Sequence, residues 1–407
     1  DDYPRPKKGS TAFSIITEVG PSPWNKHTHL LHIGIQGYDV PRAQLPAANL
    51  VFLVDVSGSM QSPDKLELLK SALRLLVREL KAEDRVSLVV YAGASGVVLE
   101  PTAGDQAATI SAALDALTAG GSTNGAAGIK MAYALAQQAF IKDGINRVIL
   151  ATDGDFNVGT VDFEMLKQLV EERREQGIGL TTLGFGSGNY NDHLMEQLAD
   201  AGNGNYAYID TLSEARKALV DEMSSTLMTI ARDVKIQVEF NPATVAEDRL
   251  IGYENRALAR EDFSNDKVDA GETGAGHSVT AIYEIALTGS AGQRLDGGRY
   301  QQTRAAEANT GELAMVKLRY KQPGADRSTL TEQVVRKEDF LQALDDTSGA
   351  YRFAAAVAGL GQVLRGGKYT GDFAYTEVLA LARGARGDDP FGYRGEFLQL
   401  TNLASSL

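Results

Sequence analysis

Residues 50–60 read LVFLVDVSGSM. The first five are all apolar, which is typical of a strand buried on both faces of a sheet. Asp55 follows directly, and the hydroxyl residues Ser57 and Ser59 come after it with Gly58 between them. Glycine relaxes the steric limits on the backbone, so the chain can turn there and direct both hydroxyls toward one point. The stretch therefore predicts a buried strand that ends in an oxygen-rich loop.

Helices and further strands are expected to alternate after this loop. An amphipathic helix follows Ser62-Pro63, a plausible cap and first helical residue, because the apolar positions between 66 and 80 fall on one helical face. Strands are predicted at 86–91, 147–151, 180–185 and 206–209. Helices are predicted at 106–117, 126–140, 163–175, 193–199 and 212–231. This alternation is typical of an α/β fold with a doubly wound, mainly parallel sheet.

The flanking segments show strand-like alternation instead. Strands are predicted at 13–19, 30–38, 234–240, 279–287 and 313–320, and they read as antiparallel. Because two strands alone are marginal in water, we expect the N-terminal pair to join the later strands in one β-sandwich, with the α/β module inserted. Separate packing of the two β segments is the alternative. Helical periodicity returns at 340–344, 351–364, 373–381 and 397–403, which predicts a small C-terminal helical region.

These patterns predict four parts. Residues 1–47 begin the sandwich, 48–232 form the α/β domain, 233–335 complete the sandwich and 336–407 are helical. The 407 residues carry a net charge of −13, which disfavours nucleic acid as a partner. There is no cysteine, so disulfides and thiolate metal sites are excluded within this chain, and no apolar run is long enough to span a bilayer.

Three loops are expected to meet at one edge of the parallel sheet. The strand at 147–151 is followed by Thr152-Asp153-Gly154-Asp155, and residues 120–124, GGSTN, open the helix before that strand. In open α/β sheets ligands bind outside the carboxyl ends of the strands, where the loop after Asp55 also lies. Oxygen donors without histidine or cysteine favour Mg²⁺, Mn²⁺ or Ca²⁺. The ion would keep an exchangeable position that accepts one carboxylate from outside.

The three loops together resemble the metal-ion-dependent adhesion site of von Willebrand factor type A domains, over about residues 49–231. The resemblance implies that Asp55, Ser57, Ser59 and Thr123 ligate the metal directly or through water, and that Asp153 acts through water. Asp155 is an additional carboxylate whose role the motif does not fix. A loop of this kind without metal is the alternative, and it is weakened because the chain keeps all five positions.

The wider chain resembles a bacterial group of YfbK-like von Willebrand factor type A proteins. The segments that carry this resemblance are 45–57, 151–159 and 203–209, which read LPAANLVFLVDVS, ATDGDFNVG and NGNYAYI. Members of the group typically carry a lipoprotein signal, an extra N-terminal segment and a C-terminal domain of unknown function. The resemblance thus implies a lipid anchor on an N-terminus that these residues lack, and a location in the bacterial cell envelope, periplasmic or at the surface.

Weaker signals complete the pattern. The segment Asn189-Tyr190-Asn191-Asp192 follows a predicted strand, so together with Asp155 it is expected to form a partner-binding rim around the metal; a plain helix cap is the alternative reading. The histidines at 27, 29 and 32 are expected to be surface or packed residues, because His32 points away from the other two on a strand. No Gly-x-Ser-x-Gly elbow surrounds Ser57 or Ser59.

These features lead to three hypotheses about function. The first is a divalent-metal-dependent protein-binding module, for adhesion or scaffolding, whose partner supplies an Asp or Glu carboxylate. The second is a regulatory scaffold in which the helix predicted at 212–231 passes a change at the metal to the β domain. The third is a metal-assisted hydrolase using Asp153 or Asp155 as base. The missing elbow and the absence of an activating histidine motif favour the non-enzymatic hypotheses.

Overall fold

The computed structural model describes residues 3–6, 11–122, 125–154, 163–186, 192–221, 227–252, 260–265, 271–295 and 311–407. The chain divides into two compact units. The α/β unit comprises Asp39–Arg232 and Gly271–His277, and the sandwich unit comprises Asp1–Tyr38, Asp233–Ala270 and Ser278–Leu407. The predicted fold class is confirmed, while the four predicted domain ranges stay a prediction.

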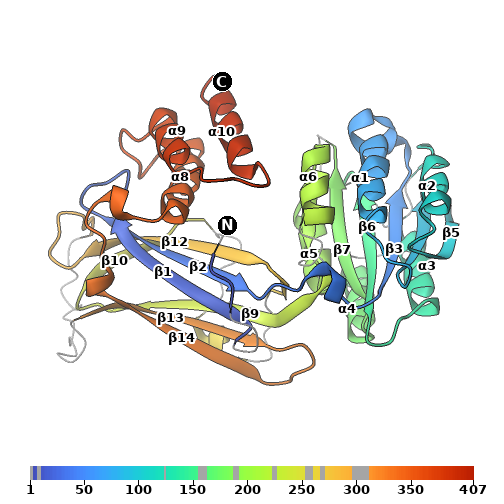
Figure 1. Ribbon diagram of the computed structural model, residues 1–407, viewed down its shortest axis with the longest axis horizontal. Coiled ribbons are helices and arrows are strands. Elements are labelled where there is room, and N and C mark those ends of the chain that lie inside the picture. Colours follow the sequence, from blue (N-terminus) through green and yellow to red (C-terminus); the bar gives the residue numbers. More distant parts are fainter. Residues whose placement is uncertain are drawn as a thin grey trace. The chain divides into compact units, whose positions relative to one another are not determined.

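The α/β unit is built on a six-stranded sheet in the order β5-β4-β3-β6-β7-β8 (Figure 1). All neighbouring strands are parallel except β5, which runs antiparallel to β4. The strands are β3 (Ala48–Asp55), β4 (Arg85–Tyr91), β5 (Ser95–Ala103), β6 (Ile145–Thr152), β7 (Gly179–Phe185) and β8 (Tyr206–Ile209).

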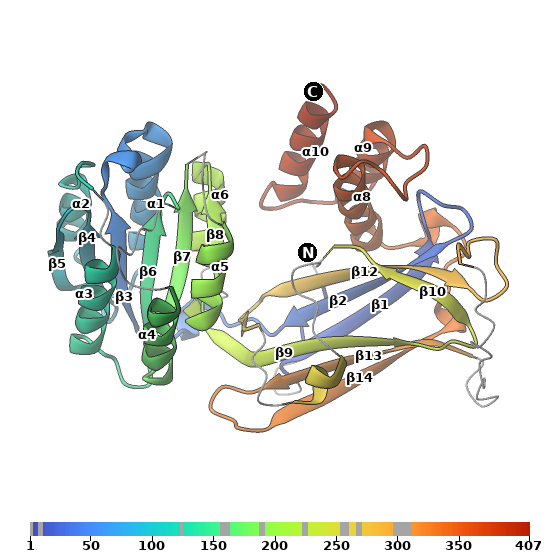
Figure 2. The same ribbon diagram turned by 180° about the vertical axis from the view of Figure 1, so that it is seen from behind.

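Helices cover both faces of this sheet (Figure 2). The helices are α1 (Leu68–Val77), α2 (Ala107–Asp115), α3 (Gly125–Gln138), α4 (Phe163–Glu175), α5 (Asp192–Ala201) and α6 (Leu212–Arg216). Successive side chains of a strand point to opposite faces. Leu50 and Phe52 of β3 therefore join one core cluster with α1, α2 and α6, while Val51 and Leu53 join the other with α3, α4 and α5. Burial on both faces explains why residues 50–54 of this strand are all apolar.

The sandwich unit contains two antiparallel sheets. One has the order β1-β2-β12-β10, and the other includes β9, β13 and β14. Rings from opposite sheets meet between them, since Phe13 of β1 lies edge-on to Tyr320 of β13 with centroids 5.0 Å apart. The strands are β1 (Phe13–Pro21), β2 (His29–Gly37), β9 (Thr229–Phe240), β10 (Val245–Leu250), β12 (Ser278–Leu287), β13 (Glu312–Lys321) and β14 (Ser328–Arg336). The first residues of β9 belong to the α/β unit and pair there with the short β11 (Thr273–Gly274).

Strand β2 lies between β1 and β12. The N-terminal strands and the later strands therefore share one sheet, which confirms the predicted joint sandwich. Nearly every residue of β2 is buried, because its second face is also covered. Leu30 packs with the C-terminal helices, which are α8 (Gly349–Leu364), α9 (Tyr375–Gly384) and α10 (Tyr393–Ala404). Among the described residues no helix is long and apolar enough to cross a lipid bilayer.

Two helix predictions are wrong. The helix predicted at 212–231 ends as α6 at Arg216, continues as a π-helical turn to Asp221, and gives way to strand β9 from Thr229. Pairing of this strand with β11 at Ala231 fixes it as extended backbone. The helix predicted at 340–344 is absent because Phe340 forms a parallel bridge with Val19 and its ring lies edge-on to His29. Tertiary contacts override local helical periodicity at both places.

The strands β5, β10 and β14 were missed by the sequence patterns. Each lies at the edge of its sheet. An edge strand has one neighbour and more exposed side chains, so it lacks a clear hydrophobic alternation. The cap expected at Ser62 is also absent, since its side chain makes no capping hydrogen bond, although Pro63 does open the helical turn Pro63–Glu67 that leads into α1.

Candidate metal centre

Two carboxylates lie at the carboxyl edge of the parallel sheet. Asp55 is the last residue of β3, and Asp153 directly follows β6. The two strands are parallel neighbours, with Val54 level with Ala151, so their ends reach the same edge. Both residues are buried. The hydroxyl of Thr152, the residue before Asp153, donates to Asp55 Oδ2 at 3.0 Å, so the ends of the two strands are in direct contact.

Asp55 is held by three donors. Its Oδ1 accepts the backbone N–H of Ser57 at 2.8 Å, and its Oδ2 accepts the hydroxyls of Thr152 at 3.0 Å and Tyr91 at 3.2 Å. Burial raises the pKa of the Asp55 carboxyl, the charge of Asp153 adds to the rise, and hydrogen bonds from Ser57 and Thr152 oppose it. Burial also raises the pKa of Tyr91 well above its ordinary value, so its hydroxyl stays a donor.

The hydroxyls of Ser57 and Ser59 point to a common place. Their Oγ atoms lie 3.0 Å apart, because the chain turns through a short 3₁₀ segment, Gly58–Gln61. The loop before α3 is fastened beside them: the N–H of Gly58 donates to the carbonyl of Gly121 at 3.0 Å, and the N–H of Gly120 donates to Val56 at 2.7 Å. The three predicted loops are thus in contact at this edge. We call the site around Asp55, Ser57, Ser59 and Asp153 the edge site.

The remaining predicted site residues cannot be placed in this arrangement. Thr123 and Asp155 lie outside the described residues, as do Asn189, Tyr190 and Asn191 of the predicted rim. Their roles stay predictions. The hydrogen bonds of Gly120 and Gly121 show only that the described chain just before Thr123 runs along the Asp55 loop.

Lys65 is a residue of the edge site that the sequence patterns did not single out. Its Nζ donates to Asp153 Oδ2 at 2.8 Å and to the carbonyl of Ser59 at 3.0 Å. The lysine comes from the turn Pro63–Glu67, six residues after Ser59. A helical-wheel reading treats it as one more polar surface position, so the only sequence signal was its closeness to the loop. The ammonium bridges the loop after β3 to the loop after β6.

The donor set of the edge site suits a hard divalent cation. Carboxylate and hydroxyl oxygens are the ligands that Mg²⁺, Mn²⁺ and Ca²⁺ prefer. The two hydroxyls in contact and the two neighbouring carboxylates supply such oxygens from adjacent loops. The described residues contain no group of three or more His, Cys, Asp or Glu that could hold a metal.

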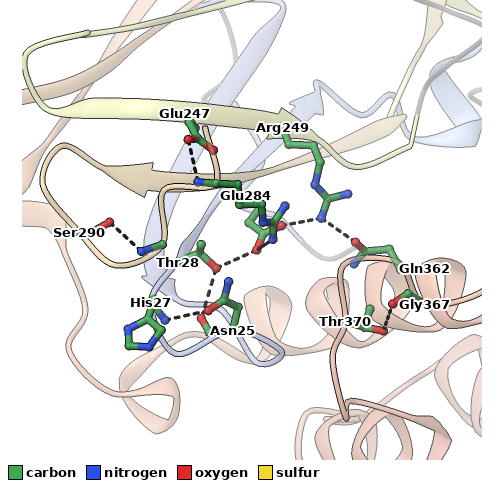
Figure 3. Close-up of polar contacts among 12 residues, drawn as sticks. Asn25, His27, Thr28, Glu247, Arg249, Glu284, Ser290, Gln362, Gly367 and Thr370 are labelled. Atoms are coloured by element: carbon green, nitrogen blue, oxygen red, sulfur yellow. Dashed lines mark hydrogen bonds and ion pairs between the residues drawn. The ribbon is translucent and has the colours of Figure 1, made fainter. Parts of the chain in front are cut away.

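Another buried carboxylate, Glu284 of β12, lies in the sandwich unit (Figure 3). Its Oε1 accepts Thr28 Oγ1 at 2.8 Å and Arg294 Nη2 at 3.2 Å, and its Oε2 accepts Arg249 Nη2 at 2.5 Å. Arg249 also donates to Gln362 of α8 at 2.7 Å. This Glu284 cluster ties the loop between β1 and β2, the strand β10 and the helix α8 to one point.

Comparison with known protein families agrees with this architecture. Residues 50–155 match the von Willebrand factor type A domain, and residues 225–407 match a family described as "Uncharacterized protein YfbK, C-terminal". The first match contains Asp55, Ser57, Ser59 and Asp153. Von Willebrand factor type A domains are in general protein-interaction modules, and they often bind divalent metals.

Similar proteins occur in several bacteria. "Uncharacterized protein YfbK" of Escherichia coli K12 is 46% identical over 397 residues, which cover 97% of this chain and 68% of that protein. A Synechocystis protein is 30% identical over 186 residues, which cover 45% of this chain and 43% of its own length. A solved structure of a von Willebrand factor type A protein from Catenulispora acidiphila is 16% identical, covers 95% of this chain and 90% of its own, and has a TM-score of 0.47.

Proposed function

The chain belongs to the YfbK family of von Willebrand factor type A proteins, and from that membership we propose that its edge site holds one divalent metal ion and binds a partner protein through it. The observation that carries the proposal is the oxygen-only set at the sheet edge. Ser57 and Ser59 present hydroxyls 3.0 Å apart beside two buried carboxylates. Mg²⁺ is the first choice of ion, with Mn²⁺ and Ca²⁺ as alternatives.

The ion would be held by both charged and neutral oxygen ligands. Asp55 and Asp153 supply negative charge, and the two serines supply neutral oxygens. Thr123 is expected to add a third hydroxyl, by resemblance to the adhesion-site motif. Because Asp55 already accepts three hydrogen bonds, its carboxylate is fixed in place before any ion arrives. When bound, the ion supplies a positive charge with an exchangeable position for an outside ligand.

We infer that the outside ligand is an Asp or Glu carboxylate of the partner. A carboxylate is a hard oxygen donor, and its charge offsets the positive charge of the ion. The rim proposed from the sequence, Asn189, Tyr190 and Asn191 together with Asp155, would then select among acidic partners.

We infer further that this site is not catalytic. A serine nucleophile needs a neighbouring base to take its proton. Among the described residues the hydroxyl of Ser57 contacts Ser59 and the Asp55 carboxylate, which we assign to the metal, and no histidine donates to or accepts from either serine. We also propose a location in the bacterial cell envelope, with a lipid anchor on an N-terminal segment outside these residues. This location rests on the family resemblance alone.

The test is affinity capture from a bacterial envelope extract on the immobilised chain. Parallel samples contain Mg²⁺ or a chelator, and the wild-type chain is compared with Asp55→Ala. We expect a partner that is retained with Mg²⁺ and lost in the chelator and on Asp55→Ala, because both treatments remove the ion. Capture that is equally strong in all samples would refute metal-dependent binding.

A serine pair provides the matched control. Ser57→Ala removes a proposed ligand and is expected to weaken capture. Ser62 lies five residues further on, and its side chain makes no capping hydrogen bond. Ser62→Ala removes its hydroxyl and is expected to leave capture unchanged. Circular dichroism of each variant confirms that loss of capture is not loss of folding. Equal weakening by both substitutions would contradict the assignment of Ser57 to the site.

A further inference from the structure

The ammonium group of Lys65 lies inside the edge site. It donates to Asp153 Oδ2 at 2.8 Å and to the carbonyl of Ser59 at 3.0 Å. The side chain of Lys65 is 17% exposed and that of Asp153 is 3% exposed, so the ion pair is largely shielded from water. Ion pairs at exposed positions contribute little, but shielding strengthens the attraction between the two charges.

The aliphatic stem of Lys65 runs close to the backbone of Gly186. Gly186 directly follows β7 and has a positive φ of 83°. A Cβ atom at this position would lie 2.4 Å from Cε and 2.7 Å from Cγ of Lys65. The stem therefore packs closely against the backbone of Gly186, and a side chain there would displace it. This contact distinguishes Lys65 from a lysine that moves freely in solvent.

The charges of the three side chains set the electrostatics of the site. Two carboxylates, Asp55 and Asp153, and one ammonium, Lys65, sum to a formal charge of −1. A divalent cation changes this sum to +1, and one partner carboxylate returns it to zero. The ammonium also repels a cation bound beside the same carboxylate, and this repulsion is stronger in a shielded site than in bulk water.

We propose that Lys65 is a built-in counter-ion that competes with the divalent metal for Asp153. The metal is then held weakly by the isolated chain and strongly once an acidic partner supplies the compensating charge. Metal and carboxylate therefore bind with positive cooperativity, and each raises the affinity of the other by the same factor. This inference rests on the proposed metal site and adds the residue that couples metal binding to partner binding.

Substitution of Lys65 by methionine separates the charge from the packing. Lys65→Met keeps an unbranched stem over Gly186 and removes the ammonium. We expect Mg²⁺ to bind this variant about tenfold or more tightly than the wild-type chain when no carboxylate ligand is present. Lys65→Arg keeps the positive charge and is expected to bind Mg²⁺ no more tightly than the wild-type chain. Lys142→Met removes an exposed lysine near the start of β6, at the opposite edge of the sheet, and is expected to change nothing.

The experiment is a calorimetric titration of Mg²⁺ into the metal-free full chain, with and without a high concentration of acetate as the carboxylate probe. Acetate is expected to raise the Mg²⁺ affinity of the wild-type chain several-fold more than that of Lys65→Met. Equal Mg²⁺ affinity of these two chains, or weaker binding by Lys65→Met, would overturn the role of Lys65 while leaving the metal site intact. Absence of Mg²⁺ binding in every chain, with unchanged circular dichroism, would overturn the proposed function itself and this inference with it.

Discussion

The edge site and the Glu284 cluster are both built on buried carboxylates, but they differ in the balance of charge. Glu284 faces two guanidinium groups, from Arg249 and Arg294, so these three side chains sum to +1. Asp55, Asp153 and Lys65 sum to −1. The carboxylate in the sandwich unit has cations in excess, whereas the edge site has one fewer cation than carboxylates.

This difference is the one expected between a stabilising ion-pair cluster and the proposed metal site. A buried charge is costly unless it is paired and hydrogen-bonded. The protein itself meets this requirement at Glu284, where Thr28 adds a further hydrogen bond. At the edge site the remaining negative charge favours a cation from outside. We therefore expect removal of the Glu284 carboxylate to lower the free energy of unfolding, and neutralisation of Asp55 to weaken metal binding.

Glu284→Gln is expected to have the largest effect on the free energy of unfolding. Loss of the carboxylate leaves two guanidiniums without their partner, and breaking a buried pair costs about 3 to 5 kcal/mol. We expect the lower end of this range, because Arg249 and Arg294 are 26% and 38% exposed. The measurement is urea unfolding followed by fluorescence of Trp24, the one tryptophan of the chain, which is buried against the C-terminal helices of the sandwich unit.

The control for this prediction is Glu239→Gln. Glu239 is half exposed and pairs with Lys317, so its loss is expected to cost less than about 1 kcal/mol. If Glu284→Gln changed the free energy of unfolding as little as the control does, the Glu284 cluster would not be a major source of stability in the sandwich unit.

A smaller effect is expected from acid on the sandwich unit. Burial lowers the pKa of His32 to about 4, and the nearby charge of Glu18 opposes this only in part. The unfolded chain takes up the proton near its ordinary value of 6.5, so stability is full above that pH and is lost as the pH falls toward 4. Between pH 7.5 and pH 5 the loss from this residue is about 2 kcal/mol.

Urea unfolding followed by Trp24 fluorescence at a series of pH values measures this loss of unfolding free energy. His32→Gln is expected to flatten the decline, and His27→Gln, at an exposed position, is expected to leave it unchanged. A decline that is the same in His32→Gln as in the wild-type chain would show that other groups cause the acid sensitivity.

The smallest effect is expected from Asp55→Asn in the absence of metal. A raised pKa means that ionisation of Asp55 opposes folding at neutral pH, so stability from this group falls as the pH rises through its folded pKa. The neutral amide removes that cost, and the unfolding free energy of the α/β unit is expected to stay unchanged or rise by up to about 1 kcal/mol. Hydrogen exchange of the β3 and β6 amides measures it.

Asp84→Asn is the matched control for that measurement. Asp84 is buried near the opposite edge of the same sheet and accepts the backbone N–H groups of Ala48 at 2.8 Å and Lys81 at 2.7 Å. Its substitution is expected to destabilise the α/β unit by about 1 to 3 kcal/mol. If Asp55→Asn destabilised the unit as much as Asp84→Asn, Asp55 would be a structural carboxylate rather than one held ready for a cation.

Sequence patterns located the interior of the fold better than its edges. The strand β3 was predictable because both its faces are buried, and its apolar run shows this directly. The edge strands β5, β10 and β14 were not predictable because many of their side chains are exposed or polar, so they lack a clear hydrophobic alternation. Phe340 was misread because its bridge to Val19 joins residues far apart in the sequence.

The edge site was predictable where chain order fixes position. Asp55, Ser57, Ser59 and Asp153 follow neighbouring parallel strands, so the sheet itself brings them to one edge. Lys65 was not predictable, since its place depends on the helical turn at Pro63 and on the close approach that Gly186 permits. Neither feature has a periodic signal. The predicted ligand roles of Asp55, Ser57, Ser59, Thr123 and Asp153 all stay predictions.

Direct titration of Mg²⁺ into the metal-free chain tests whether the edge site holds one divalent ion. We expect one ion to bind per wild-type chain and binding to be lost in Asp55→Asn, while Glu284→Gln, under conditions where it remains folded, binds as the wild-type chain does. Absence of binding to the wild-type chain, or binding that survives Asp55→Asn unchanged, would contradict this expectation.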